Sequence, residues 1–389
     1  MITIFTPVYN RADVIGRLYE SLLRQTDYHF EWLIIDDGST DSVAERVGHW
    51  IETKEAPFPI RFYQQENGGK HRAINRGVQL AQGDAFFIVD SDDYLTADAV
   101  ELVGNWWKNI ENDDCYAGIS GLRGDSNGEV IGDIPLFESY IDATNMERAA
   151  YGLLGDKAEV YKTSLLKKEP FPEFIGENFL TEAVVWDKLA DQSLKIRWFN
   201  RVIYVCEYRS DGLTSQGWKA FVNNPMGWGL YIQQKCRFYH LDGEEKAGQY
   251  LEYYIFMKDR LSDREMMNYL GIDGEELEKI IADYEQCIKR TISDIGSNLG
   301  VYGAGTRGIK VLKLYEGTEV QISFILDKKK VDVPCRHIDL SERYPKVDAI
   351  IVTPKDGQSE IIDFLTERTE SRLVSYEEWK ACVGAGGTE

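Results

Sequence analysis

The chain has 389 residues, of which 43% are hydrophobic and 12% aromatic, and its formal net charge is −21 at pH 7. This composition builds packed cores and excludes a disordered chain, and the length suits two domains with a connector. The acidic surface disfavours nucleic acid as a partner, so an anionic substrate requires a local basic pocket or a bound cation.

The first 110 residues alternate short apolar runs with amphipathic runs. Strands are predicted at 2–7, 31–39, 60–65 and 84–90, and helices at 12–25, 41–53 and 71–83. This alternation predicts a parallel sheet covered on both faces, with its ligand crevice beyond the carboxyl ends of the strands. Polar clusters follow three strands there: "TP" at 6–7, "DDGS" at 36–39 and "DSDD" at 90–93. We therefore expect them to share one crevice.

The rest of the chain divides into three regions. Residues 114–209 are less regular, with predicted strands at 115–122, 158–162 and 201–208 and a helix at 181–192. Residues 218–297 are mostly helical, and a strand with a glycine turn then opens a second α/β unit. The predicted domains are residues 1–215, a helical connector at 216–297, and residues 298–389.

Three carboxylates, Asp90, Asp92 and Asp93, follow the buried strand "FFIV". One interpretation is a turn that leads to an N-cap at Thr96. The other is a site for a divalent metal or a nucleotide ribose, because Mg²⁺ and Mn²⁺ are typically held by one or two carboxylates together with phosphates and waters. The cluster alone leaves both interpretations open.

Four segments occur in a fixed order: "TPVYNRADVIGRLYESLLRQ", "WLIIDDGSTD", "ENGGKHRAINRGVQLAQGD" and "FFIVDSDDYLTADAV". Together they resemble the nucleotide-binding half of family 2 glycosyltransferases, strongly over residues 1–110 and more weakly over 110–215. The resemblance implies an α/β chain with a GT-A nucleotide-diphospho-sugar transferase fold, followed here by the helical connector and a smaller Rossmann-like domain. It also implies an inverting glycosyltransferase that uses a UDP-sugar donor and Mn²⁺ or Mg²⁺.

The resemblance assigns roles to particular positions. Thr6, Pro7 and Tyr9 match the segment that lines the nucleotide base, and Asp37 matches the carboxylate that accepts a hydrogen bond from uracil. The further candidates for contact with the sugar nucleotide are Asn67, Gly69, Lys70, His71, Asp90 and Ser91. Asp90 and Asp92 match the DxD motif, whose first carboxylate faces the ribose or donor sugar and whose second holds the metal; Asp93 is the alternative to Asp92.

Each of these positions also has a structural interpretation. Tyr9 suits a core, residues 37–39 suit a loop with Asx turns, and Lys70 suits a solvated surface. His71 begins a predicted helix and suits capping or packing.

The acceptor hydroxyl must lose a proton as it attacks, and a positioned carboxylate contributes roughly 10²–10⁴-fold to that step. Thr181 is a predicted N-cap, which puts Glu182 in the first turn of a helix over 182–190. Family members commonly carry an acidic pair at such a helix start, whereas here the second position is Ala183. Glu182 is the expected base and Glu177 the alternative, while helix stabilisation alone would also explain Glu182. The stretch "EYRSDGLTS" resembles a segment that closes over the donor in some family members. Arg209 in this stretch is a candidate for contact with the diphosphate.

The second α/β unit contains a glycine-rich turn after its first strand. Gly303, Gly305 and Gly308 form GxGxxG, and Asp327 follows the next strand. This spacing suits a dinucleotide fingerprint, in which a pyrophosphate approaches a helix N-terminus. The turn also suits packing or dimerisation without a ligand.

The sequence further predicts a cytoplasmic protein. Its six cysteines form no CxxC pair, no apolar run reaches 18 residues, and no signal sequence begins the chain.

The expected acceptor is a saccharide or lipid-linked saccharide of bacterial surface polysaccharide, with homo-oligomers and attachment to the inner face of the membrane left open. One alternative is a nucleotidyltransferase, although such an enzyme is expected to carry a glycine-rich, basic loop after its first strand and "TPVYNRAD" is neither. The other alternative is a non-catalytic sugar-nucleotide-binding protein.

Overall fold

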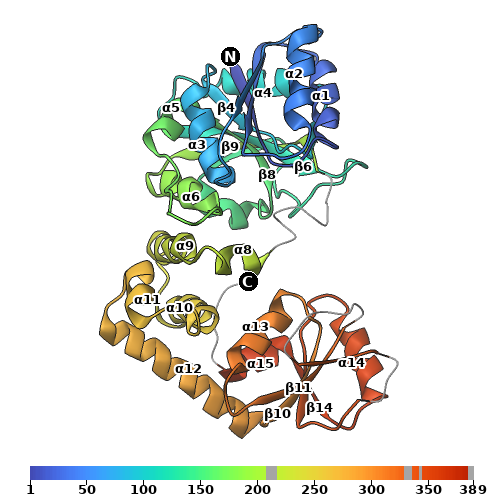
Figure 1. The fold of residues 1–389 in the computed structure, drawn as a ribbon, viewed down its shortest axis with the longest axis vertical. Helices are drawn as coiled ribbons and strands as arrows, with labels where there is room; N and C mark the ends of the chain where they lie inside the picture. Colours follow the sequence, from blue (N-terminus) through green and yellow to red (C-terminus); the bar gives the residue numbers. More distant parts are fainter. Residues whose placement is uncertain (207–216, 328–334, 341–343, 384–389) are drawn as a thin grey trace. The chain divides into compact units, whose positions relative to one another are not determined.

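The computed structural model describes residues 1–206, 217–327, 335–340 and 344–383. The chain separates into two compact units, one of residues 1–216 and 226–234 and the other of residues 217–225 and 235–389. Each unit has its own sheet (Figure 1). The helices of the expected connector group mainly with the second sheet, so the boundary at residue 298 stays a prediction.

The first unit contains a nine-stranded mixed sheet in the order β3-β2-β1-β4-β8-β6-β9-β5, with β7 paired to β9. The strands are β1 (Ile2–Val8), β2 (Phe30–Asp36), β3 (Ile60–Gln64), β4 (Ala85–Ile88), β5 (Tyr94–Leu95), β6 (Tyr116–Gly124), β7 (Tyr140–Ala143), β8 (Lys157–Lys162) and β9 (Lys195–Val205). The first four are parallel, whereas β8 runs antiparallel to β4 and β6. The carboxyl ends of β1, β2 and β4 therefore lie at one edge.

Helices cover both faces of this sheet (Figure 1). They are α1 (Ile15–Leu23), α2 (Val43–Thr53), α3 (Lys70–Leu80), α4 (Ala99–Trp107), α5 (Thr163–Lys168) and α6 (Ala183–Asp191), with a 3₁₀ helix η1 (Asn145–Tyr151). Alternate strand residues point to opposite faces. Ile4 of β1 thus joins the core that contains α1, α2 and α4, and Phe5 joins the core that contains α3 and α6.

The second unit contains a five-stranded parallel sheet in the order β12-β11-β10-β13-β14. Its strands are β10 (Asn298–Tyr302), β11 (Gln321–Leu326), β12 (Arg336–Ile338), β13 (Ala349–Val352) and β14 (Arg372–Ser375). The helices between the two sheets in sequence are α8 (Trp218–Val222), α9 (Pro225–Phe238), α10 (Gly243–Met257), α11 (Asp263–Leu270) and α12 (Gly274–Asp294). The remaining helices are α13 (Thr306–Tyr315), α14 (Gln358–Thr366) and α15 (Tyr376–Val383). α9 contributes residues to both units.

The expected fold class is confirmed: an α/β unit with a large sheet, a helical segment and a second, smaller α/β unit. Some elements differ from the expectation. β9 begins at Lys195 rather than at residue 201, and α6 begins at Ala183. β5, β7 and η1 were not predicted, because segments of two to seven residues are too short for a clear hydrophobic period.

Candidate active site

Three segments of the first unit meet at the carboxyl edge of its parallel strands. Asp37 directly follows β2, Asp90 lies two residues after β4, and the segment after β3 enters α3 at Lys70. The Gly69 amide donates a hydrogen bond to Asp37, and Lys70 forms an ion pair with Asp90. The structure therefore brings these four residues together.

The Asp37 carboxylate organises the loop that precedes α3. Its Oδ1 accepts hydrogen bonds from Gln65 Nε2 at 2.7 Å and Gly68 N at 3.0 Å. Its Oδ2 accepts from Gly69 N at 2.7 Å and Asn67 Nδ2 at 3.2 Å. Because a carboxylate has about four lone-pair positions, these donors occupy all of them. A uracil N–H would have to displace one of these donors in order to bind Asp37.

Gly69 is a position of close backbone approach. Its φ is +95°, which favours glycine, and a Cβ built there would lie 1.8 Å from the carbonyl oxygen of Asn178. The loop before α3 therefore packs directly on the segment that leads to Glu182.

Lys70 bridges two carboxylates. Its Nζ lies 2.7 Å from Asp90 Oδ1 and 3.0 Å from Glu182 Oε1. Burial lowers the pKa of the Lys70 ammonium, but the charges of Asp90 and Glu182 outweigh burial and raise that pKa above its usual value. Lys70 is thus a cation at any physiological pH, and it supplies positive charge to this acidic edge.

Asp90 is surrounded by donors and cations. Its Oδ2 lies 3.7 Å from Arg123 Nη1, and its backbone N–H donates to Tyr204 Oη at 2.9 Å. Burial raises the pKa of Asp90, but the charges of Lys70 and Arg123 outweigh burial and lower it. Asp90 is therefore a carboxylate with its charge already compensated.

Asp92 and Asp93 have different surroundings. Asp93 is 7% exposed and accepts a hydrogen bond of 2.8 Å from Tyr204 Oη. Asp92 is half-buried, and its Oδ2 forms an ion pair with Arg11 Nε at 3.9 Å. Burial and then the charge of Asp90 raise the pKa of Asp92. Of the two, Asp92 is the carboxylate that an added cation would stabilise more.

The next question is whether the carboxylates at this edge of the sheet suit Mn²⁺ or Mg²⁺ as ligands. In the parts of the chain that the structure describes, no group of three or more His, Cys, Asp or Glu side chains is arranged to hold a metal ion. These ions, however, commonly take only one or two protein carboxylates, with phosphates and waters as the other ligands. The chemistry of Asp92, with Asp90 beside it, fits that smaller requirement.

Glu182 occupies the N-cap position of α6, one residue before the helix begins. The expected N-cap, Thr181, accepts only a long contact of 3.4 Å from Ala183 N through its hydroxyl. The Glu182 side chain is 35% exposed and forms an ion pair with Lys70. It is therefore accessible to an acceptor from solvent.

Glu177 has a structural place instead. It is 4% exposed, and its carboxylate accepts hydrogen bonds from the amides of Met226 at 2.7 Å and Gly227 at 2.8 Å, both in the first turn of α9 and both in the first unit. Burial raises the pKa of Glu177 although these bonds lower it. Because both oxygens are engaged, Glu177 is poorly placed to take a proton from an acceptor.

The other predicted contacts with the sugar nucleotide vary in accessibility. The Thr6 hydroxyl accepts a hydrogen bond from Trp32 Nε1 within the core, whereas Tyr9 is 49% exposed. Pro7 is half-buried, Asn67 is exposed and Ser91 is buried. Arg209 lies outside the described residues.

His71 is buried in the first turn of α3, and its Nδ1 has no hydrogen-bond partner among the residues that the structure describes. Burial and then Arg72 lower the pKa of His71. This placement agrees with the packing interpretation.

Sequence reasoning missed Arg123 and Tyr204, which come from β6 and β9. The Arg123 guanidinium lies 4.3 Å from the centre of the Tyr204 ring and within 4.0 Å of both Asp90 and Asp93. No local motif marks either residue, since their positions depend on the pairing of β6 with β9. The one local indication in the sequence was that Arg123 is a basic residue near the end of a predicted apolar strand.

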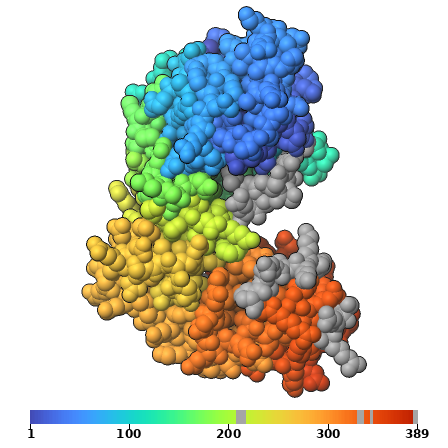
Figure 2. Space-filling view, viewed as in Figure 1, coloured from blue at the N-terminus to red at the C-terminus, as the bar shows by residue number. Residues whose placement is uncertain are grey.

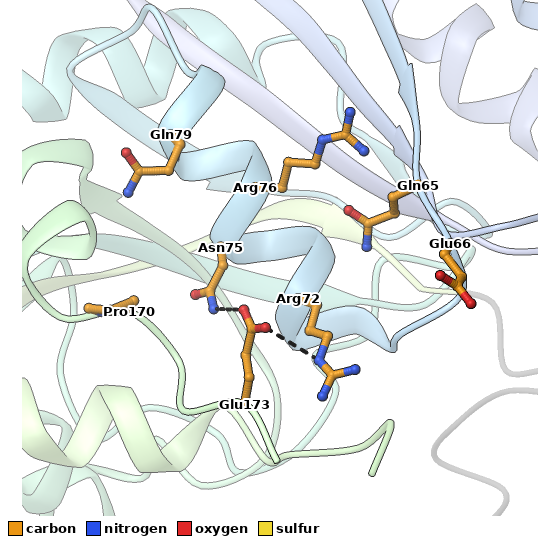
Figure 3. A pocket seen from close by; sticks show the side chains of 8 residues that line it. All are labelled: Gln65, Glu66, Arg72, Asn75, Arg76, Gln79, Pro170 and Glu173. Atoms are coloured by element: carbon orange, nitrogen blue, oxygen red, sulfur yellow. Dashed lines mark hydrogen bonds and ion pairs between the residues drawn. The ribbon is translucent and has the colours of Figure 1, made fainter. Parts of the chain in front are cut away.

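A shallow pocket of about 560 Å³ lies on the outer side of α3 (Figure 3). Its lining residues are Gln65, Glu66, Arg72, Asn75, Arg76, Gln79, Pro170 and Glu173. Figure 3 shows Asn75 and Arg72 turned toward Glu173. These residues connect α3 to the segment after α5.

The glycine turn of the second unit joins β10 to α13. Gly303 has a φ of +93° and approaches Thr353, and a Cβ on Gly308 would lie 1.9 Å from the Gly303 carbonyl oxygen. A Cβ on Gly305 would meet no atom of the described residues within 4 Å. Asp327 Oδ2 accepts a hydrogen bond of 2.7 Å from Ala304 N, so it supports the turn itself. The turn remains a candidate nucleotide site.

Residues 3–163 match the family model described as glycosyl transferase family 2. The glycosyltransferase GlyA of Streptococcus pneumoniae is 27% identical over 228 residues, which are 55% of this chain and 31% of GlyA. The poly(ribitol-phosphate) beta-glucosyltransferase of Bacillus spizizenii is 29% identical over 178 residues, 45% of this chain and 27% of that protein. The aligned part of the chain therefore spans about a third or less of these relatives.

Among solved structures, TarS 1–349 of S. aureus in complex with UDP-GlcNAc is similar with a TM-score of 0.49 and 18% identity, over 81% of this chain and 86% of that one. Within the described residues, none of the helices combines the length and apolarity needed to cross a membrane.

Proposed function

We propose that the chain is a family 2 glycosyltransferase, because residues 3–163 match the model of that family. It transfers a sugar from a UDP-sugar to a hydroxyl of a saccharide or lipid-linked saccharide acceptor, with inversion. The observation that carries this proposal is the bridge from Lys70 to both Asp90 and Glu182. It puts a cation, the first carboxylate of the DxD motif and a solvent-accessible carboxylate in one place. Synthesis of bacterial surface polysaccharide is the proposed setting.

The reaction is a single displacement. The acceptor oxygen forms a bond to the anomeric carbon and gives its proton to the Glu182 carboxylate, while the bond from that carbon to the phosphate oxygen breaks and UDP leaves with the electron pair. Lys70 stabilises the charge that develops on the leaving diphosphate, and Asp90 orients the donor sugar or ribose. A Mn²⁺ or Mg²⁺ ion held by Asp92 would add further positive charge at the diphosphate.

The second unit has a separate proposed role. Its turn at Gly303, Gly305 and Gly308 would bind a nucleotide or sugar nucleotide at the start of α13, which spans ten residues. Asp327 would support this turn through its bond to Ala304 rather than contact a ribose.

Glu182→Gln tests the proposed chemistry. UDP release is measured from a panel of UDP-glucose, UDP-galactose, UDP-N-acetylglucosamine and UDP-glucuronate with Mn²⁺ present, where water replaces the acceptor. The variant should release UDP roughly 10²–10⁴-fold more slowly, because a positioned base contributes about that factor. UDP affinity by calorimetry should stay within about twofold, since the carboxylate acts on the acceptor.

Asp191→Asn, at the exposed other end of α6, is the matched control and should keep the parental rate. A Glu182→Gln enzyme that turned over at the parental rate would remove Glu182 from the mechanism. If it also bound UDP normally, a catalytic site with a different base would be the better explanation, whereas a parent that binds UDP but releases none from any donor would favour the non-catalytic alternative.

A further inference from the structure

The segment that carries the proposed base has no regular secondary structure. It runs from the end of α5 at Lys168 to the start of α6 at Ala183. Because this segment forms no helix or strand, no regular set of backbone hydrogen bonds holds it in place. Its position therefore depends on side-chain and backbone contacts with neighbouring elements.

Asn75, in the middle of α3, makes a two-way connection to this segment. Its Nδ2 donates to the Phe171 carbonyl at 2.9 Å, and its Oδ1 accepts from the Phe171 amide at 2.8 Å. The same Nδ2 donates to Glu173 Oε1 at 2.7 Å. The side-chain amide therefore satisfies both backbone groups of one residue, as a neighbouring strand would.

Two other positions of the same helix region reinforce this connection. Arg72 Nη2 donates to the Phe174 carbonyl at 2.5 Å, and its Nε lies 3.5 Å from Glu173 Oε2. Gly69, at the N-cap of α3, lies against the Asn178 carbonyl. Light-blue and green parts of the chain meet at the surface of the first unit, in agreement with these contacts (Figure 2).

The first residue of the same helix is Lys70, which contacts Asp90 and Glu182. Asn75 lies five positions further along α3, so one rigid helix holds the donor-side lysine and the segment that leads to the base. A displacement of about 1 Å at a reacting group can slow catalysis about 10²-fold.

We infer that Asn75 is a positioning residue that sets the place of Glu182 through residues 171–178, without contact with substrate. This inference rests on the proposed function of Glu182. It predicts that loss of the Asn75 side chain slows UDP release only when Glu182 is present to act as the base.

The test is a double-mutant cycle of Asn75→Ala and Glu182→Gln, with UDP release measured from the fastest donor of the panel above. Asn75→Ala should lower the rate about 10- to 100-fold in the parent and by no more than about twofold in the Glu182→Gln background. UDP affinity should stay within about twofold in all four proteins. Gln79→Ala, one turn further along the same exposed face of α3, is the control and should keep the parental rate.

Asn75→Asp serves if Asn75→Ala does not fold. It keeps the acceptor for the Phe171 amide but faces the Phe171 carbonyl and the Glu173 carboxylate with an oxygen in place of a donor. The inference is overturned by equal losses in both backgrounds, which mean that Asn75 acts independently of Glu182. It is also overturned by parental rates in the Asn75→Ala and Asn75→Asp enzymes. A Glu182→Gln enzyme with the parental rate, or a parent that releases no UDP, refutes the proposed function and the inference with it.

Discussion

Lys70 Nζ lies 3.0 Å from Glu182 Oε1, so the candidate base is paired with the cation that also holds the first aspartate of the DxD motif. Under the proposed function, this arrangement joins donor recognition and acceptor activation through one ammonium group. It also means that a change at position 70 affects two carboxylates together.

Lys70→Met should weaken UDP binding about tenfold or more, because a charge-assisted contact contributes roughly 1.5–3 kcal/mol. UDP release should fall further than binding, since Glu182 loses its ion pair. Calorimetry with UDP and Mn²⁺ measures the first effect and a coupled assay for UDP the second. Lys70→Arg, which keeps the charge, should retain part of both. Unchanged UDP affinity in Lys70→Met would place the diphosphate elsewhere.

Asp92→Asn should abolish the part of UDP binding that depends on Mn²⁺ and leave the melting temperature at or above that of the parent. The reason is that burial and the charge of Asp90 already raise the pKa of Asp92, so a neutral amide relieves repulsion. Calorimetry with and without Mn²⁺, together with thermal melting, measures both effects.

Asp93→Asn is the matched comparison. It should lower the melting temperature, because it replaces the carboxylate that accepts from Tyr204 in a buried place. If Asp93→Asn rather than Asp92→Asn removed the Mn²⁺ dependence, the two roles would be exchanged.

Asp37→Asn should destabilise the first unit by about 1–3 kcal/mol, the usual consequence of leaving a buried donor unsatisfied. The new NH₂ group would face amide donors of residues 65–69, which now occupy the carboxylate. Asn67→Ala, which removes a single donor, should have a smaller effect. Urea denaturation checks the order of these two variants, and equal stabilities would contradict the loop-organising role of Asp37.

Lys157→Met should stabilise the first unit near pH 7. Lys157 is fully buried, and burial followed by the charge of Arg148 lowers its pKa from 10.5 to about 8. Between about pH 8 and 10.5 the unfolded chain holds a proton that the folded chain lacks, so stability of the parent rises with pH across this window. Below about pH 8 Lys157 is charged in the folded chain, and the full cost of burying this charge, up to about 3 kcal/mol, lowers the free energy of unfolding.

Melting curves at pH 7 and pH 10 test this account. The Lys157→Met variant should melt several degrees above the parent at pH 7, and the difference should shrink at pH 10. The Leu154 carbonyl keeps its bond from Asp133 N after the substitution, so no acceptor is left unpaired. A difference that did not depend on pH would show that Lys157 does not titrate in this window.

The local alternation of strands and helices predicted that Asp37 and Asp90 share one edge, because parallel strands end together, whereas Lys70 was a candidate only through the family resemblance. The same reasoning could not find Arg123, whose relation to Asp90 depends on the pairing of β6 with β9, far apart in the sequence. It also favoured Glu177 as an alternative base, since a carboxylate near a helix has the same local pattern whether it faces an acceptor or, as here, the first amides of α9.

The crowding at Gly69 limits how this protein can be re-engineered. A loop transplanted from another protein to replace residues 169–182 can pass as close as the Asn178 carbonyl does only while position 69 carries no side chain. The two segments are therefore sterically coupled, and a donor loop taken from a protein with a side chain at the position of Gly69 would have to be exchanged together with the 66–70 segment.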